Sequence, residues 1–347
     1  MPTRDSSEGR TGEEATTTLV CVDTGTTNTR VWLVDGERIL ARQEAAVGAR
    51  DSARDGDDRR LRAALRELIA GVRAHAEKGA GPRQVAAAGM ITSPQGVHEV
   101  PHLVAPVGAA ELAEAAQERL LPDVCDLPFV FVPGLRTTSI PGTDGGVGGT
   151  DVMRGEETLA VGLLGQGLLA PKSALLNLGS HWKVIGIDEA GRVAWSLTSL
   201  AGEMMQAVRA ETILASAVPA GPLAAPDVTL LSEGMDEARR SGLARALFCV
   251  RLLELSGGSR AKGRLSFLVG AFIGAELDRL QARGALPRGT PVTLSGDAKL
   301  GGAWAIALDR GGCPVRSLSA AETESGFLAG LCAIIAARPR LTAAPTV

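Results

Sequence analysis

The sequence predicts an α/β protein of two similar domains that face each other across a cleft. The first observation is an internal repeat, since each half opens with a strand, a polar tip, a returning strand and a third strand, and continues with helices. The second is that both tips carry a glycine followed by a hydroxyl residue, Gly25-Thr26 and Gly179-Ser180. The third is length, because 347 residues can build two domains with sizeable cores.

In the first half, short apolar runs bounded by glycine or polar residues predict strands, and apolar residues at every third or fourth position predict helices. These elements are expected in the order strand 19–23, strand 29–34, strand 38–44, helix 61–78, strand 85–88, helix 109–120 and strand 128–132. The stretch 133–151 is rich in glycine and is expected to be a mobile loop. Another helix is expected to start near Glu156.

The second half repeats this opening and then becomes mainly helical. Its elements are expected in the order strand 174–178, strand 184–188, strand 193–198, helices 203–215, 235–255 and 265–283, strand 291–294, a short strand near Val315 and helix 324–337. The predicted domains are a polar, disordered N-terminal tail over 1–18, a first domain over 19–170 and a second domain over 171–347.

Composition excludes several classes of protein. The formal net charge is −3 and aromatic residues make up only 3% of the chain, so no nucleic-acid partner and no membrane partner is expected. The five cysteines are scattered without a Cys-x-x-Cys pair, which favours reduced thiols in a cytoplasmic protein. No run of about 18 apolar residues is present, so no membrane span is expected.

The first polar tip, DTGTTNT at 23–29, is longer than a tight turn requires. Backbone N–H groups at a glycine-containing turn can hold phosphate oxygens, and hydroxyl groups add donors. The Asp23 carboxylate would repel phosphate unless a divalent cation lay between them, and Mg²⁺ needs only one or two carboxylates besides the phosphates. We therefore expect Asp23 to bind the metal and Gly25, Thr26, Thr27 and Asn28 to clamp the phosphates of ATP. The alternative is a polar hairpin tip without a ligand.

Several motifs resemble those of one kinase family. DTGTTNTRVWL at 23–33 resembles the first phosphate motif of the acetate and sugar kinase/Hsp70/actin superfamily. Within that superfamily, the chain is similar to the 2-dehydro-3-deoxygalactonokinases. The matching segments run in order along most of the chain: AGMITS at 88–93, VMRGEET at 152–158, NLGSHWKV at 177–184, LTSLAGEMM at 197–205, FLVGAFIGAE at 267–276 and LSGDAKLGGAW at 294–304.

The resemblance implies an actin-like ATPase fold, in which two ribonuclease-H-like domains, each with a five-stranded sheet and helices, enclose a central cleft for ATP and substrate. It also implies phosphorylation of the 6-hydroxyl of 2-dehydro-3-deoxy-D-galactonate by Mg·ATP in galactonate catabolism. This chain departs from the superfamily pattern at two places. Asn177-Leu178-Gly179 lacks the acidic residue that many members carry, which leaves Asp23 as the main metal candidate. The adenosine-side segment reads SGDAKL instead of carrying a double glycine.

Phosphoryl transfer needs in-line positioning, charge neutralisation and a group that deprotonates the attacking hydroxyl, usually a carboxylate. Glu156 and Glu157 are the candidates for this base, and Asp23 acts beside them through the metal. The alternative for both glutamates is ordinary stabilisation of a helix N-terminus. Two further acidic residues are candidates for the base, but a structural role explains each at least as well. Glu203 also lies near a helix start, and Asp151 is placed to be an N-cap.

Other residues are candidates for holding the two substrates. Arg154 can bind the carboxylate of a sugar acid through a bidentate pair, and the alternative is a surface arginine. Thr92 and Ser93 follow a buried strand and are either hydroxyl ligands of the sugar or parts of a simple turn.

The second tip is expected to hold the β- and γ-phosphates of ATP through Gly179, Ser180 and His181, although His181 can equally be structural. Lys183 lies on the same face of its strand as His181 and reaches either phosphate or solvent. Gly296 and Asp297 are expected to border the adenosine.

Three other functions compete with this one. They are a different sugar or sugar-acid kinase of the superfamily, a non-catalytic nucleotide-binding regulator, and a phosphoanhydride hydrolase that uses water as the acceptor. The expected partners are the small-molecule sugar acid and ATP, with a homodimer as a possible assembly. The motifs do not distinguish the two epimers of the substrate at C4.

Overall fold

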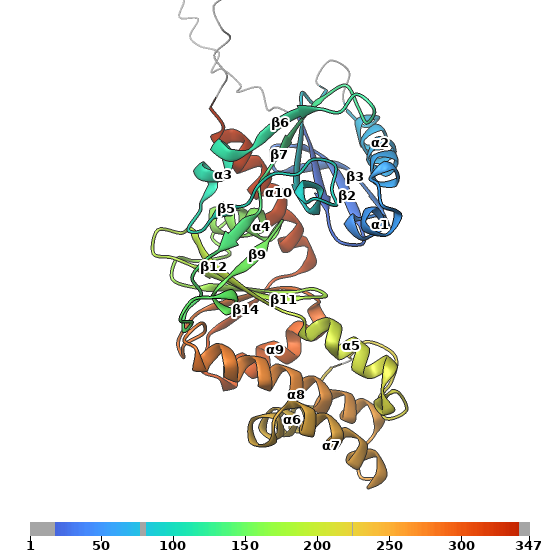
Figure 1. Cartoon of the computed structure of the whole chain (residues 1–347), viewed down its shortest axis with the longest axis vertical. Coiled ribbons are helices and arrows are strands. Elements are labelled where there is room, and N and C mark those ends of the chain that lie inside the picture. Colours follow the sequence, from blue (N-terminus) through green and yellow to red (C-terminus); the bar gives the residue numbers. More distant parts are fainter. Residues whose placement is uncertain (1–17, 77–80, 224, 340–347) are drawn as a thin grey trace, which may run out of the picture.

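Two mixed β-sheets with the same strand order organise the chain (Figure 1). The computed structural model describes residues 18–76, 81–223 and 225–339. The predicted disordered tail lies outside the described residues except for Thr18, which is buried.

The first sheet has the order β3-β2-β1-β4-β7-β6. Strands β1, β2 and β3 form an antiparallel meander, β4 and β7 continue the sheet parallel to β1, and β6 adds an antiparallel edge. The bounds are β1 Leu19–Thr24, β2 Thr29–Asp35, β3 Arg38–Ala45, β4 Val85–Gly89, β6 Gln117–Leu120 and β7 Pro128–Phe131.

The second sheet has the order β12-β11-β10-β13-β14 and repeats that plan, with an antiparallel meander followed by two parallel strands. The bounds are β10 Ala174–Leu178, β11 Trp182–Ile187, β12 Val193–Ser199, β13 Val292–Gly296 and β14 Val315–Ser317. The expected pair of ribonuclease-H-like sheets is therefore confirmed, although the first sheet has six strands instead of five. The domain boundary at 170/171 stays a prediction.

A third, small sheet was not expected. It has the order β5-β8-β9, with β5 Leu103–Val104, β8 Leu135–Thr137 and β9 Asp151–Met153. Strands β8 and β9 lie at the two ends of the segment that the sequence predicts to be one glycine-rich loop. Asp151 in this sheet accepts hydrogen bonds from the hydroxyls of Ser196 at 2.6 Å and Thr198 at 2.9 Å, so the small sheet is fastened to β12 of the second half.

Four helix predictions were wrong in part. The helix expected over 61–78 ends at Arg73, and its positions 77–78 lie outside the described residues, while the helix expected over 203–215 ends at Glu211. The helix expected over 109–120 ends at Ala115, and residues 117–120 form β6 because they pair with β7. The helix expected over 235–255 is two helices, since Gly242 has a φ of +81° that breaks the ladder. The helix bounds are α1 Ala49–Asp55, α2 Arg59–Arg73, α3 Ala109–Ala115, α4 Glu156–Gly165, α5 Ala201–Glu211, α6 Val228–Ser241, α7 Leu243–Leu255, α8 Ala261–Ala282, α9 Ala298–Arg310 and α10 Ala320–Ala337.

Three large apolar cores hold these layers together, and a fourth, small one joins α6, α7 and α8. Side chains alternate along β1, so that Val20 and Val22 pack toward α2 whereas Leu19 and Cys21 pack toward α4 and α10. The core that contains Leu19 and Cys21, which we call the central core, also includes residues of the second sheet. A separate core joins the second sheet to α8 and α9. Helix α10, which runs between the two sheets in Figure 1, therefore lies at the junction of the two halves.

Helices α4 and α10 touch through glycines. A Cβ atom on Gly162 would lie 1.7 Å from the carbonyl oxygen of Gly326, and one on Gly330 would lie 1.9 Å from that of Thr158. Among the described residues, α10 alone is long and apolar enough, by length and composition, to cross a membrane. Its buried residues pack against α4 in the central core, so packing within the protein also accounts for its apolar composition.

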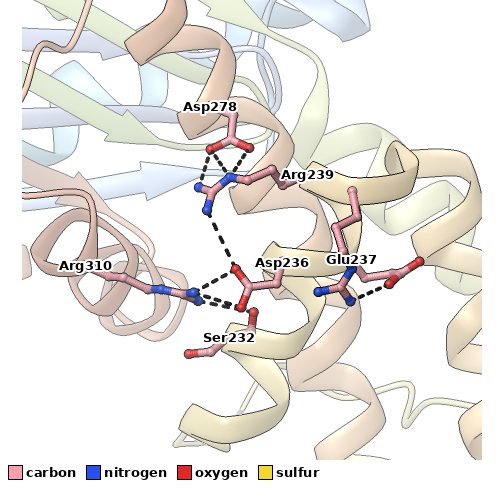
Figure 2. Close-up of polar contacts among 7 residues, drawn as sticks. Ser232, Asp236, Glu237, Arg239, Asp278 and Arg310 are labelled. Carbon is pink, nitrogen blue, oxygen red and sulfur yellow. Dashed lines mark hydrogen bonds and ion pairs between the residues drawn. The ribbon is translucent and has the colours of Figure 1, made fainter.

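An ion-pair network ties the helices below the second sheet (Figure 2). Arg239 of α6 pairs with Asp278 of α8 at 2.6 Å, and Arg310 of α9 pairs with Asp236 of α6 at 2.7 Å. Arg239 also lies 3.7 Å from Asp236, so the two pairs are joined. These side chains are a quarter to a half exposed, and each pair is therefore expected to contribute at most about 1 kcal/mol.

Candidate functional site

The first polar tip is a tight turn between β1 and β2. The Gly25 N–H donates to the Asn28 carbonyl at 2.8 Å, and the buried hydroxyl of Thr29 donates to the Val47 carbonyl at 2.8 Å. The first two N–H groups of α1, those of Ala49 and Arg50, donate to the carbonyl oxygens of Gly25 and Thr26 at 3.1 and 2.9 Å. The carbonyl side of the turn is thus fixed against the protein.

This arrangement leaves amide donors free. Within the described parts of the chain, the backbone N–H groups of Thr26 and Thr27 have no hydrogen-bond partner, while Thr27 and Asn28 are exposed. Gly48 makes the arrangement possible, because a Cβ there would lie 2.6 Å from the Thr26 backbone. The sequence analysis missed Gly48, because the need for a glycine there becomes evident only when α1 is seen to lie against the tip.

Asp23 is the last residue but one of β1, two residues before Gly25. Its partner on β2 is Arg30, whose guanidinium lies 3.5 Å from the carboxylate. Burial raises the pKa of Asp23 to about 6, against the opposing effect of Arg30, and the neighbouring Glu156 raises it further. The side chain is still 24% exposed, so solvent limits that rise. A carboxyl held this way can bind a cation, because a cation would offset the cost of burying its charge.

The start of α4 places Arg154, Glu156 and Glu157 close together. Glu157 is fully buried and both carboxylate oxygens accept the Gly155 N–H, at 2.8 and 3.0 Å. Burial and the neighbouring Glu156 raise the pKa of Glu157 to about 7. Both observations make Glu157 a residue that shapes the helix start, whereas the Glu156 carboxylate pairs with Lys183.

Glu156 pairs with Lys183 across the two halves of the chain. The Lys183 ammonium lies 3.1 Å from Glu156 Oε1 and donates to the Val152 carbonyl at 3.3 Å. The two side chains are only 8% and 21% exposed. The other carboxylate oxygen, Glu156 Oε2, is buried and has no hydrogen-bond partner among the described residues. The site thus holds a carboxylate with one oxygen neutralised and one oxygen free.

The second polar tip lies between β10 and β11. The Gly179 N–H donates to the His181 carbonyl at 3.2 Å, and Gly179 and Ser180 are exposed. His181 Nε2 lies 3.2 Å from Glu203 of α5, so two residues that the sequence analysis considered separately are partners. Helix α5 packs directly against the tip, since a Cβ on Gly202 would lie 2.4 Å from the Ser180 carbonyl oxygen.

The adenosine-side candidates begin α9. Gly296 lies beside Leu178 at the end of β10, and the Asp297 N–H donates to the Leu178 carbonyl at 2.9 Å. The Asp297 carboxylate caps α9 by accepting the N–H groups of Lys299 at 2.8 Å and Leu300 at 3.0 Å. One of its oxygens makes both bonds, which leaves the other for a ligand.

Two cavities, each of about 630 Å³, meet at Leu178 and Gly179. The first, which we call the helical cavity, lies in the second half and is lined by Ser180, Asp297 and residues of α5, α8 and α9. The second, which we call the central cavity, is lined by Asp23, Arg154, Glu156 and the start of α10. The fold therefore gathers many of the predicted residues around two adjoining spaces.

Some predicted residues do not line either cavity. Thr92 is buried, donates to the Gly89 carbonyl at 3.0 Å and accepts from Arg154 at 2.8 Å. Ser93 is also buried and donates to the Met90 carbonyl at 2.7 Å. Both hydroxyls are thus used within the protein, Thr92 to hold Arg154 and Ser93 to close a turn. No group of three or more His, Cys, Asp or Glu side chains that could hold a metal occurs among the described residues.

Comparisons with known proteins agree on one family. A model of the family described as 2-keto-3-deoxy-galactonokinase matches residues 23–334. The 2-dehydro-3-deoxygalactonokinase of Escherichia coli (strain K12) is 26% identical over 320 residues, covering 92% of this chain and 98% of that protein. A crystal structure from Sinorhizobium meliloti that carries the same kinase name superposes with a TM-score of 0.72 at 27% identity, covering 91% of this chain and 97% of that one.

Proposed function

Because the chain belongs to the 2-keto-3-deoxy-galactonokinase family and is a kinase, we propose that it phosphorylates 2-dehydro-3-deoxy-D-galactonate at its 6-hydroxyl with Mg·ATP. The observation that carries this proposal is the carboxylate of Glu156. Its buried Oε2 lacks a partner among the described residues, and the residue lines a cavity of about 630 Å³ together with Asp23 and Arg154. A free carboxylate oxygen next to the metal candidate is what an attacking hydroxyl needs.

In this proposal Glu156 is the general base. Its Oε2 accepts the proton of the 6-hydroxyl, while the Lys183 ammonium holds Oε1 at 3.1 Å and keeps the carboxylate in place. Glu157 fixes the start of α4 through the Gly155 N–H and does not contact the sugar. Arg154, anchored on Thr92, supplies positive charge toward the acid end of the substrate.

The two polar tips would hold the phosphates of ATP. The free N–H groups of Thr26 and Thr27 fit phosphate oxygens on the first side, and the exposed Gly179-Ser180 tip is the corresponding turn of the second half. Asp23 fits Mg²⁺ as a single carboxylate, since phosphate oxygens and waters supply the other ligands. The bound Mg²⁺ would neutralise charge on the phosphates of ATP.

The helical cavity would take the nucleoside. Trp182, Met205 and Leu223 give it apolar walls, and Asp297 and Gln206 add polar groups, a mixture typical of small-molecule sites. The central cavity would take the sugar acid. This division agrees with a boundary at 170/171 between the two domains, which we retain as part of the proposal.

ADP release tests the reaction. Purified protein is mixed with Mg·ATP and either 2-dehydro-3-deoxy-D-galactonate, its gluconate epimer or plain hexoses, and ³¹P NMR locates the phosphate on the product. We expect ADP release with the galactonate compound and a 6-phosphate product. Release with both epimers would indicate a broader sugar-acid kinase. Release without any acceptor would indicate a hydrolase, and no release at all would favour a regulator.

Matched variants test the assignment of the base. Glu156→Gln is expected to lower kcat by about 10²- to 10⁴-fold, the usual contribution of a general base. Glu157→Gln keeps an acceptor for the Gly155 N–H and is expected to lower kcat much less. Asp23→Ala should also lower kcat by orders of magnitude and weaken the dependence on Mg²⁺. Equal losses in the two glutamate variants would contradict the assignment of Glu156.

A further inference from the structure

The outer face of the small sheet β5-β8-β9 carries a row of three residues. Leu135 of β8 pairs with Leu103 of β5 on one side and with Met153 of β9 on the other. Because β5 runs parallel to β8 and β9 runs antiparallel to it, the residue before Leu135, which is Gly134, lies between His102 and Arg154. The missing side chain at Gly134 allows His102 and Arg154 to meet, because a Cβ there would lie 2.5 Å from Arg154 Cγ and 3.1 Å from the His102 ring. Arg154 lies 3.4 Å from His102 Nδ1 through one terminal nitrogen.

The next row on the same face places Arg136 between two exposed valines. Arg136 pairs with Val104 on β5 and with Val152 on β9, and these valines are 47% and 51% exposed. Leu135 and Met153 point the other way into the central core, as strand alternation requires. Arg136 is exposed, and among the described residues its guanidinium has no hydrogen bond or ion pair.

The charges on this face are not balanced. Burial, reinforced by the charges of Arg154, Arg136 and Lys183, lowers the pKa of His102 to about 4, so the imidazole is neutral at pH 7. Burial lowers the pKa of Arg154, although Glu157 and Glu99 oppose that change. Arg154 itself hydrogen-bonds Thr92, the Val100 carbonyl and His102, which are all neutral. Both guanidinium groups thus influence His102 on this face, and neither forms an ion pair with a carboxylate in the described chain.

We propose that this face binds the carboxylate of the sugar acid, with Arg136 making the direct contact and with Arg154, which His102 helps to position, adding positive charge beside it. The inference rests on the proposed function, because it names the part of that site that selects an acid. Arg154 has already committed its terminal nitrogens to Thr92 and Val100, whereas the guanidinium of Arg136 is free for a bidentate contact.

The placement agrees with the position of the central cavity. Arg154 lines that cavity together with Glu156. Arg136 lies in the next row on the same face of the small sheet, as the register of β8 and β9 shows. A carboxylate bound by Arg136 therefore lies on the face that continues from the Arg154 side of the cavity.

The test compares Arg136→Met with Arg38→Met, a matched control at another exposed arginine of a strand that has no partner in the described chain. Both proteins are assayed with the sugar acid and with its carboxamide, which lacks the negative charge. For Arg136→Met we expect the KM for the acid to rise about 10- to 100-fold, since hydrogen bonds to a charged group are lost. The KM for ATP and the activity with the carboxamide should change less than about twofold, and Arg38→Met should match the wild type.

The deciding quantity is how strongly each protein prefers the acid to the carboxamide. If the ratio of kcat/KM for acid over carboxamide is the same in Arg136→Met and wild type, the inference is wrong even though the proposed function stands. Should the wild-type protein release no ADP with any sugar acid, calorimetric titration of 2-dehydro-3-deoxy-D-galactonate and galactonate still tests the face. Binding that Arg136→Met weakens would then support the anion site while the proposed reaction fails, and binding equal in both proteins, or absent from the wild type, would overturn the inference.

His102 provides a second measurement. His102→Gln retains a side chain that can accept from Arg154, whereas His102→Leu removes the acceptor. We expect His102→Leu to raise the KM for the acid severalfold and His102→Gln to restore most of the affinity. Equal effects of the two variants would contradict the positioning role.

Discussion

The ion pair between Lys183 and Glu156 should behave as a buried pair that joins the two halves of the chain. The perturbation is a double-mutant cycle of Lys183→Met, Glu156→Gln and the combined variant. Each single change leaves one charge without its partner, while the combined change removes both charges. Because β11 belongs to the second sheet and α4 follows the small sheet, the cycle measures a contact across the junction of the two halves.

The expected magnitude follows from the exposure of the two side chains. Removing one partner of a buried pair costs about 3–5 kcal/mol. Here Lys183 is 8% exposed and Glu156 is 21% exposed, so solvent reduces the cost toward about 3 kcal/mol for Glu156→Gln and about 2 kcal/mol for Lys183→Met. The combined variant should lose only about 2 kcal/mol, which corresponds to a coupling energy of about 3 kcal/mol.

Urea denaturation followed by circular dichroism measures the cycle, provided that the m-value is the same in all four proteins. The control is the pair of Lys172 and Glu189, which lie 2.7 Å apart but are 67% and 80% exposed. Lys172→Met is expected to cost less than about 1 kcal/mol, as exposed pairs do. Additivity of the two single changes within about 0.5 kcal/mol would refute the reasoning, because it would mean that the pair is not coupled in the folded protein.

Three further predictions concern glycines and a buried carboxyl. Gly162→Ala should destabilise the protein by about 3 kcal/mol or more because its Cβ would meet α10, whereas Gly165→Ala on the same helix meets nothing within 4 Å and should gain up to about 1 kcal/mol in urea denaturation. Gly134→Ala should displace Arg154 and raise the KM for the sugar acid about tenfold, and an unchanged KM would show that the close approach is unimportant. The folded-state pKa of Glu157, about 7, lies above its ordinary value of 4.5, so its contribution to stability is present at low pH and is lost as pH rises from about 4.5 to 7. The stability of Glu157→Gln relative to wild type should therefore increase over that range, and a difference independent of pH would contradict the raised pKa.

The sequence predicted the two main sheets because their signals are local. Strands such as β1 and β10 are short apolar runs that end at polar tips, and such runs can be identified without knowledge of their partners. The small sheet gave no such signal, since β5 and β9 have only two and three residues and owe their pairing to neighbours far along the chain. The break at Gly242 was missed because helical residues continue on both sides of it.

The residues of the candidate site also fall into those with a local sequence signal and those without one. Asp23 and Glu156 could be proposed from motifs, since Asp23 ends a predicted strand two residues before Gly25 and Glu156 follows Gly155 at the start of a predicted helix. The partners of these residues could not, because Lys183 reaches Glu156 from another sheet and Glu203 reaches His181 from a helix. Arg136 and His102 carry no motif at all, and only the register of β5, β8 and β9 brings them to one face.

Gly89 and Gly155 explain why the two carboxylates of the site lie together. A Cβ on Gly155 would lie 3.3 Å from the Gly89 Cα atom, and a Cβ on Gly89 would lie 3.1 Å from Asp23 Oδ1. The backbones at the end of β4 and the start of α4 are therefore in close contact, with Asp23 on one side of this contact and Glu156 on the other. Each carboxylate is a like charge for the other, and Glu156 contributes to the raised pKa of Asp23. In the proposed function, a cation bound by Asp23 would offset this repulsion and favour the ionised form of Asp23, so the close approach of the two glycines places the proposed metal ligand beside the proposed base.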